Sequence, residues 1–354
     1  MVARVQRRES AVQPAGVSDL DSDHPLERNL ALELVRVTEA AALHAARWMG
    51  RGDKEAADQA AVDAMRDALR FVDMDGVVVI GEGEKDEAPM LYIGERVGTG
   101  RPPKVDVAVD PIDGTNLTAK GLPNAITVVA LAERGSMYYD PHIMYMQKIA
   151  VGPAAKGAID INAPVKDNLV RIARFMERNV EDITVVVLDR PRHVELIEEI
   201  RTAGARIKLI TDGDVAGAVM ASLPGDTGVD VLMGIGGTPE AVLATCALKC
   251  LHGEMQCKLW PRSEEEKQLA REAGNLDLDR VLSMNDLVNS DDVFFAASGI
   301  TDGEFLQGVR YRGDLAETSS IMMRARSGTI RRCETHHHLD LKRNLPSGSP
   351  YVPD

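Results

Sequence analysis

Hydrophobic and polar residues follow two different periods along the first half of the chain. Residues 26–48 place apolar side chains at three- and four-residue intervals, which predicts a long amphipathic helix, and a second helix is expected over residues 55–70. Short apolar or alternating runs that predict strands follow at 77–80, 104–110, 125–133 and 145–152. We therefore expect residues 26–168 to form an α+β lobe, preceded by a disordered tail over residues 1–25.

The second half of the chain alternates strand and helix patterns. Strands are expected at 184–189, 206–211 and 229–237, and each is followed by a helix pattern, at 193–205, 215–223 and 238–251. This order predicts a parallel sheet covered by helices. Further strands are predicted at 293–300, 308–314, 319–326 and 328–339. We expect an α/β substrate-binding lobe over residues 169–340 and a mobile tail over residues 341–354, so the fold class is α/β.

Composition and charge exclude several classes of protein. The chain has 354 residues and a formal net charge of −14, which opposes nonspecific binding to nucleic acid or to anionic membranes. No apolar run is long enough to span a bilayer, and the N-terminus has no secretory signal. Its four cysteines form neither a disulfide framework nor a zinc pattern, and Cys246 and Cys250 are expected in the core. A reducing cytoplasm fits best.

The segment DPIDGT, residues 110–115, places two carboxylates where a predicted strand ends. Asp110 and Asp113 would repel each other unless a cation lay between them, and Mg²⁺ or Mn²⁺ prefers such oxygen ligands. Gly114 allows the backbone to approach a ligand, and Thr115 offers a hydroxyl and an amide to a phosphate or an attacking water. The alternative is an ordinary solvated turn, in which Asp, Pro and Gly are all common.

Three other segments carry acidic side chains that could join this site. In GEGEKDE, Glu82 or Glu84 could reach an ion shared with Asp110, although an acidic hairpin loop explains that segment alone better. Lys54 and Asp58 are spaced i, i+4 at a helix start, which by itself is better explained as an intrahelical ion pair. Glu240, in the first turn of a helix, is either a further metal ligand or a favourable charge near the helix dipole.

Basic and polar side chains follow the predicted strands of the second half. Arg190 and Arg192 flank a proline in LDRPRH and could hold a phosphate, or be exposed loop residues. Asp212 and Asp214 in TDGD could accept hydrogen bonds from sugar hydroxyls. GIGGTPE is not a dinucleotide fingerprint, because it lacks the third glycine and places Pro239 early in the helix.

These segments together resemble a known enzyme family. WMGRGDK, VVVIGEGEKDEAPMLY, VDVAVDPIDGT, DRPRH, TDGDVA, GIGGTPE and SGTIRR closely resemble the class II fructose-1,6-bisphosphatases, which belong to the lithium-sensitive, metal-dependent phosphatase superfamily. The likeness extends from residue 29 to residue 339. It implies a layered α/β/α/β/α sandwich and a cytoplasmic homo-dimer or homo-tetramer. It also implies hydrolysis of the 1-phosphate of fructose 1,6-bisphosphate in gluconeogenesis.

The resemblance also implies roles for individual residues. The implied metal ligands, for two or three Mg²⁺ or Mn²⁺ ions, are Asp58, Glu82, Asp110, Asp113 and Glu240. The implied catalytic residues are Asp110, Thr115, which helps to activate the attacking water, and Lys54, which lies near the reacting phosphate. The positions that match substrate-binding residues are Asp113, Gly114, Thr115, Tyr145, Arg190, Arg192, Asp212, Asp214 and Gly237.

Three positions depart from the common family pattern, and other substrates remain open. Asp113 stands where relatives often have Glu, Gln59 where glycine is common, and Arg190 where some members have Lys. None of these changes removes a required chemical group. Alternative substrates are sedoheptulose 1,7-bisphosphate or a monophosphate such as inositol phosphate, and the paired arginines favour a substrate with a second phosphate. A noncatalytic metabolite-binding regulator would be expected to lack a metal ligand or Thr115, and all are present.

Overall fold

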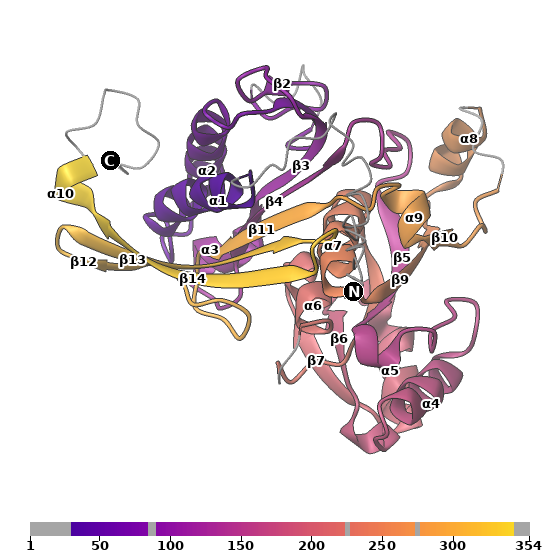
Figure 1. Ribbon diagram of the computed structural model, residues 1–354. Coiled ribbons are helices and arrows are strands. Elements are labelled where there is room, and N and C mark those ends of the chain that lie inside the picture. Colours follow the sequence, from indigo (N-terminus) through magenta and orange to yellow (C-terminus); the bar gives the residue numbers. More distant parts are fainter. Residues whose placement is uncertain (1–29, 84–89, 224–226, 273–276, 343–354) are drawn as a thin grey trace, which may run out of the picture.

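The computed structural model describes residues 30–83, 90–223, 227–272 and 277–342, which form two β-sheets with helices between and around them (Figure 1). The first sheet has the order β12-β13-β11-β4-β3-β1-β2, with β14 paired to β13. Its strands are β1 (Asp75–Ile80), β2 (Arg96–Val97), β3 (Lys104–Asp113), β4 (Ile126–Glu133), β11 (Phe294–Gly299), β12 (Arg310–Arg312), β13 (Leu315–Arg324) and β14 (Thr329–His338).

The second sheet has the order β10-β9-β5-β8-β6-β7. Its strands are β5 (Tyr145–Val151), β6 (Thr184–Leu188), β7 (Arg206–Ile210), β8 (Val231–Gly237), β9 (Glu254–Leu259) and β10 (Leu282–Ser283). The helices are α1 (Leu30–Ala46), α2 (Lys54–Leu69), α3 (Thr115–Lys120), α4 (Val165–Phe175), α5 (Val194–Ala203), α6 (Asp214–Met220), α7 (Thr238–Leu251), α8 (Glu264–Glu272), α9 (Met284–Leu287) and α10 (Leu339–Lys342).

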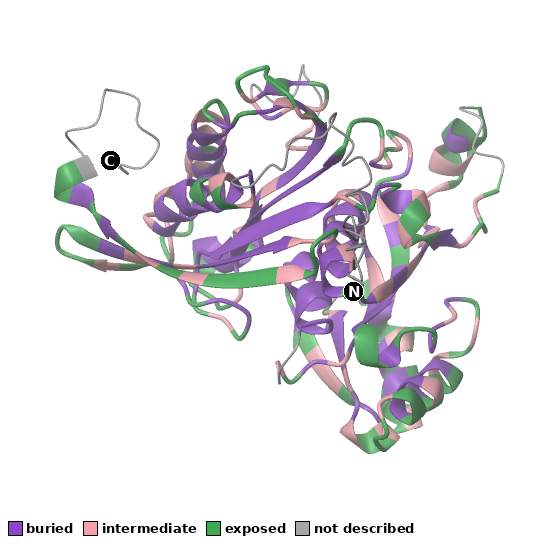
Figure 2. Ribbon diagram, in the orientation of Figure 1, coloured by how far each residue is buried: buried purple, intermediate pink, exposed green. Residues whose placement is uncertain are grey.

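Alternating side chains of the first sheet bury two different cores. On β3 and β4, Val107 and Val129 face α1 and α2, whereas their neighbours Ala108 and Val128 face the middle helical layer. This is the period of two expected for a strand, but here both faces are covered, so the runs are almost continuously apolar. Figure 2 shows these central strands as nearly uninterrupted buried segments.

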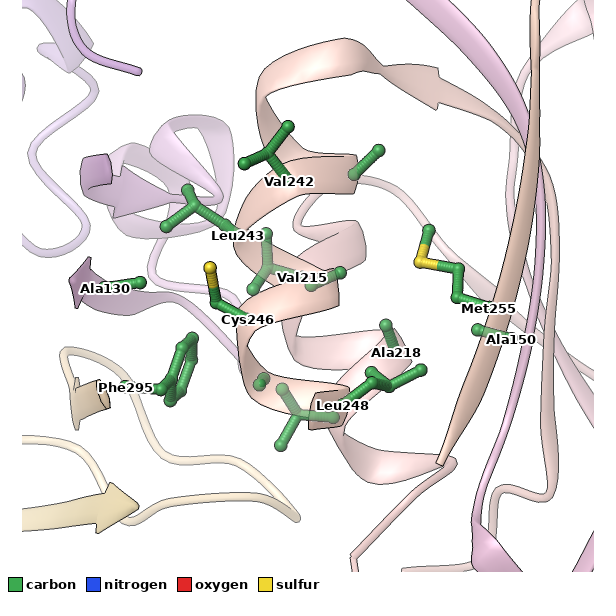
Figure 3. Packing of buried hydrophobic residues seen from close by; sticks show 14 of the residues in the cluster. Ala130, Ala150, Val215, Ala218, Val242, Leu243, Cys246, Leu248, Met255 and Phe295 are labelled. Carbon is green, nitrogen blue, oxygen red and sulfur yellow. The ribbon is translucent and has the colours of Figure 1, made fainter. Parts of the chain in front are cut away.

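Helices α6 and α7 fill the space between the two sheets. Ala130 and Phe295 of the first sheet lie on one side of α7, and Ala150 and Met255 of the second sheet lie on the other (Figure 3). Because α7 packs on both sides, its sequence is apolar almost all round, and the predicted core residue Cys246 is fully buried within it.

Helices α4 and α5 cover the outer face of the second sheet. Ile172 and Ile200 on these helices share a core with Val185 and Val187 of β6. The order of layers is therefore α1 and α2, first sheet, α6 and α7, second sheet, and α4 and α5. The predicted α/β/α/β/α sandwich is confirmed.

The prediction of a parallel sheet holds for only part of the second sheet. β6 pairs in parallel with β7 and with β8, as the strand–helix alternation predicts, but β5 is antiparallel to both β8 and β9. The reason is topological: β5 comes from the first half of the chain and lies between two strands of the second. Conversely, β11 to β14 complete the first sheet. Each sheet thus takes strands from both predicted ranges, and the division at residue 168 stays a prediction.

Some predictions fall outside the described residues. The predicted tail over 1–25 lies there, as does the tail over 341–354 except for residues 341 and 342, which end α10. Glu84 also lies there. Among the helices that the structure describes, none is long and apolar enough to cross a membrane.

Candidate active site

A cleft of about 590 Å³ opens where both sheets and the middle helices meet. Several strands end at it (β1, β3, β6, β7 and β8), and α2, α3, α6 and α7 begin there. In α/β proteins ligands bind at such carboxyl ends of strands. Every residue predicted for the site lines this cleft: Lys54, Asp58, Glu82, Asp110, Asp113, Gly114, Thr115, Tyr145, Arg190, Arg192, Asp212, Asp214, Gly237 and Glu240.

The DPIDGT segment is shaped by an irregularity at the end of β3. The strand continues to Asp113 rather than ending at Asp110, and its register against β4 shifts between these two residues. The side chain of Asp110 accepts a hydrogen bond from the Ile112 amide at 3.0 Å, within this irregular part of the strand. Such a bulge re-aims side chains, and here both carboxylates line the cleft.

The turn that follows requires its glycine. Gly114 has φ of 100°, and a Cβ there would lie 2.9 Å from Cδ1 of Leu117. The chain then enters α3 with Thr115, whose hydroxyl donates to the carbonyl of Ile112 at 3.2 Å. The Thr115 oxygen can therefore still accept a hydrogen bond from a ligand or a water molecule.

Five carboxylates line the cleft and form what we call its carboxylate end: Asp58, Glu82, Asp110, Asp113 and Glu240. Burial, followed by repulsion from Asp113, raises the pKa of Asp110 well above its ordinary value. Burial raises the pKa of Glu82 to about 8, and the charges of Asp58 and Glu240 add to the effect. Burial is also the largest cause that raises the pKa of Asp113, although a hydrogen bond from the Ala216 amide at 3.1 Å lowers that pKa. The protein alone therefore disfavours the ionised cluster.

This end of the cleft fits a divalent cation. The Oε2 atom of Glu240 is buried and has no hydrogen-bond partner among the described residues, and burial also raises the pKa of this carboxyl. In the part of the chain that the structure describes, no group of three acidic, imidazole or thiol side chains is already arranged as a metal site. A set of carboxylates with oxygen atoms alone suits hard cations such as Mg²⁺ or Mn²⁺.

Arg190, Arg192 and Tyr145 line the same cleft and form what we call its arginine end. Nη2 of Arg190 lies 3.7 Å from Oδ1 of Asp212, so these side chains form a loose ion pair. Asp212 also accepts hydrogen bonds from the backbone and side-chain nitrogens of Asn116, at 3.3 and 3.2 Å. Asn116 lines the cleft but was not predicted, because its contact joins segments that are 96 residues apart in the chain.

Arg192 is held by the backbone of β8. Its Nε and Nη2 atoms donate to the carbonyl of Ile235 at 3.1 and 2.8 Å, and its guanidinium carbon lies 5.2 Å from the centre of the Tyr145 ring. Arg192 is thus oriented before any ligand binds. Two guanidinium groups beside an aromatic ring can bind an anionic group such as phosphate.

A buried ion pair lies beneath the cleft, and sequence reasoning missed half of it. Nζ of Lys148 lies 2.7 Å from Oδ2 of Asp214, and the two side chains are only 2% and 8% exposed. Burial alone would lower the pKa of Lys148, but the charges of Asp214 and Glu240 outweigh it and raise that pKa. Lys148 could have been found from its position, because it shares the inward face of β5 with Met146 and Ala150.

The start of α2 differs in detail from the expectation. Nζ of Lys54 lies 3.5 Å from Oε1 of Glu55, so its described ion pair is with the next residue rather than with Asp58. Asp53 caps the helix by accepting from the Ala56 amide at 3.0 Å. Gln59 is exposed and donates to Asp63 at 2.7 Å, so its side chain extends along the helix surface.

Comparisons with known proteins show the family to which the chain is related. The chain matches the family model described as "Bacterial fructose-1,6-bisphosphatase, glpX-encoded" over residues 28–337. It is 48% identical over 327 residues to fructose-1,6-bisphosphatase class 2 of Haemophilus influenzae, covering 89% of this chain and 98% of that protein. It is 47% identical over 329 residues to fructose-1,6-bisphosphatase 1 class 2 of Escherichia coli strain K12, covering 90% and 97%. The matched region includes every element that lines the cleft.

Proposed function

This chain belongs to the family of bacterial, glpX-encoded fructose-1,6-bisphosphatases, and we propose that its cleft hydrolyses the 1-phosphate of fructose 1,6-bisphosphate to give fructose 6-phosphate and phosphate. It is a phosphoric monoester hydrolase of a metal-dependent, gluconeogenic family. One observation carries the assignment of the site: a single cleft is lined both by five carboxylates with raised pKa values and by two arginines.

The carboxylate end is the proposed site of the reaction. Asp58, Glu82, Asp110, Asp113 and Glu240 would hold two or three Mg²⁺ or Mn²⁺ ions. Such ions would supply positive charge to the 1-phosphate and favour ionisation of the attacking water. The water oxygen then bonds to phosphorus, the bond between phosphorus and the oxygen on C1 breaks, and the sugar oxygen leaves with a proton from the water.

The protein's own residues orient the reacting groups at this end. The Thr115 oxygen, whose hydroxyl proton is directed to Ile112, accepts a hydrogen bond from the attacking water and holds that water in place. Lys54 is at the mouth of the cleft, where its ammonium group can bind an oxygen of the same phosphate.

The arginine end is the proposed binding site for the rest of the substrate. Arg190 and Arg192 bind the distant phosphate beside Tyr145. The carboxylates of Asp212 and Asp214 can accept hydrogen bonds from sugar hydroxyls, and the backbone at Gly237 approaches closely because it has no side chain. A cytoplasmic location and a homo-dimer or homo-tetramer are part of the same proposal.

The direct test is phosphate release by the purified protein from a panel of sugar phosphates. The panel contains fructose 1,6-bisphosphate, sedoheptulose 1,7-bisphosphate, fructose 1-phosphate and inositol 1-phosphate, with Mg²⁺, Mn²⁺ and Li⁺ varied. We expect the highest kcat/KM with fructose 1,6-bisphosphate, and inhibition by Li⁺. Equal rates with inositol 1-phosphate would contradict a role for the arginine end.

A further inference from the structure

The carboxyl ends of β6 and β8 separate just before they reach the cleft. The two strands pair in parallel only at Val185 with Val231 and at Val186 with Leu232. Beyond that point the ring of His193 occupies the gap: Nδ1 lies 2.7 Å from the carbonyl oxygen of Leu188, and Nε2 lies 2.7 Å from the amide nitrogen of Ile235. The side chain is 1% exposed.

These two contacts define the chemical state of His193. A carbonyl oxygen can only accept, so Nδ1 must carry the hydrogen, whereas the Ile235 amide donates, so Nε2 must be unprotonated. The ring is therefore neutral and in one tautomer. Burial lowers its pKa, and the charges of Arg192 and Arg190 act in the same direction. Gly234 leaves room for the ring, since a Cβ there would lie 3.1 Å from Nε2.

One residue of β8, Ile235, is thus held through its amide and its carbonyl by two successive residues that follow β6. His193 binds the amide of Ile235, and Arg192 binds its carbonyl through Nε and Nη2. No described residue forms a hydrogen bond with Nη1 of Arg192, so this group is available to a ligand in the cleft. Any shift of Ile235 would move the carbonyl on which the guanidinium rests.

We propose that His193 is a positioning residue for the distant phosphate: it ties Ile235 to Leu188 and thereby sets the direction of Arg192. The inference rests on the proposed function, because it takes the group bound by Arg192 to be a phosphate of the sugar bisphosphate. His193 does not line the cleft, so it acts through Arg192 and not by touching the substrate.

Two substitutions test separately the hydrogen bond from His193 to Leu188 and the hydrogen bond from Ile235 to His193. His193→Asn places an amide nitrogen where Nδ1 donates to Leu188 but has no acceptor for Ile235. His193→Gln places an amide oxygen where Nε2 accepts from Ile235 but has no donor for Leu188. We expect His193→Asn to raise KM for fructose 1,6-bisphosphate by about five- to tenfold with little change in kcat, as suits loss of one buried hydrogen bond. His193→Gln should be affected less.

A double-mutant cycle with Arg192→Ala decides whether His193 acts through the arginine. Arg192→Ala alone raises KM; if the proposal holds, adding His193→Asn to it raises KM by less than about twofold more. The preference for the bisphosphate over fructose 1-phosphate should also fall in His193→Asn, because fructose 1-phosphate lacks the distant phosphate.

Three outcomes would overturn the inference. One is an unchanged KM in His193→Asn. The others are fully additive effects in the cycle and equal losses of kcat/KM on both substrates in both His193 variants, which would indicate a general structural role. An inactive wild-type protein with fructose 1,6-bisphosphate would instead overturn the proposed function, and this inference with it.

Discussion

The carboxylate end and the arginine end of the cleft differ in how their charges are balanced. At the carboxylate end, burial and neighbouring carboxylates raise the pKa of Asp110, and Oε2 of Glu240 has no hydrogen-bond partner among the described residues. At the arginine end, Arg192 rests on a backbone carbonyl and Arg190 on Asp212. The arginine end is therefore balanced by groups of the protein, whereas the carboxylate end has an excess of negative charge, which is why we propose that cations bind and the reaction takes place there.

Lys148 is buried and forms an ion pair with Asp214, which lines the cleft, and its removal should have the largest effect. Lys148→Met leaves the Asp214 carboxylate buried without its partner, so we expect the free energy of unfolding to fall by about 3–5 kcal/mol. Urea denaturation of the metal-free protein measures this. Lys267→Met on α8, whose ion pair with Glu264 is exposed, is the control and should cost less than about 1 kcal/mol. Equal costs would contradict the importance of the buried pair.

Asp110→Asn and Thr115→Ala test the carboxylate end. Each should reduce kcat by at least about a hundredfold with the fold intact, because each removes a group that holds or orients the reacting centre. Steady-state kinetics gives kcat, and circular dichroism checks the fold. Asp67→Asn, on the exposed surface of α2, is the matched control. Near-normal turnover in either site variant would refute the assigned roles.

Arg192→Ala tests the arginine end and should leave the chemistry in place. We expect KM to rise by about tenfold or more with kcat nearly unchanged, since the arginine binds a phosphate that does not react. Arg201→Ala, on the surface of α5, should have no effect. A fall in kcat at constant KM would show that the two ends do not divide the work as described.

A smaller effect follows from the pKa of Glu82. Its value of about 8 in the folded protein exceeds the ordinary 4.5, so folding favours the protonated form. This contribution to stability is complete below about pH 4.5 and is lost as the pH rises to about 8. The Tm of metal-free protein should therefore fall over this range, and Glu82→Gln should flatten the fall. A pH-independent difference between the two proteins would contradict it.

The sequence predicted the site's composition better than its contacts. The helix predicted at 238–251 and the acidic turn at the end of β3 are local features, set by periodicity and by turn residues. The inward position of Lys148 on β5 follows from strand alternation, but its partner Asp214, like the partners of Asn116 and His193, lies far along the chain, where no local pattern identifies it.

The same limit applies to the sheets. Strand–helix alternation predicted the parallel pairs of β6 but not the insertion of β5 beside β8. β9 lies outside the predicted strands, although its buried and partly exposed residues alternate strictly. A strand's neighbours are chosen by packing across the whole molecule, and local propensity does not contain that information.

The most direct test compares phosphate release from fructose 1,6-bisphosphate by chelator-treated protein before and after Mg²⁺ or Mn²⁺ is restored, with substrate binding to the chelated protein measured in parallel by calorimetry. We predict that the chelated protein binds the substrate weakly through its arginine end but does not turn it over, and that added cations restore hydrolysis. Full-speed hydrolysis by the metal-free protein would contradict the account.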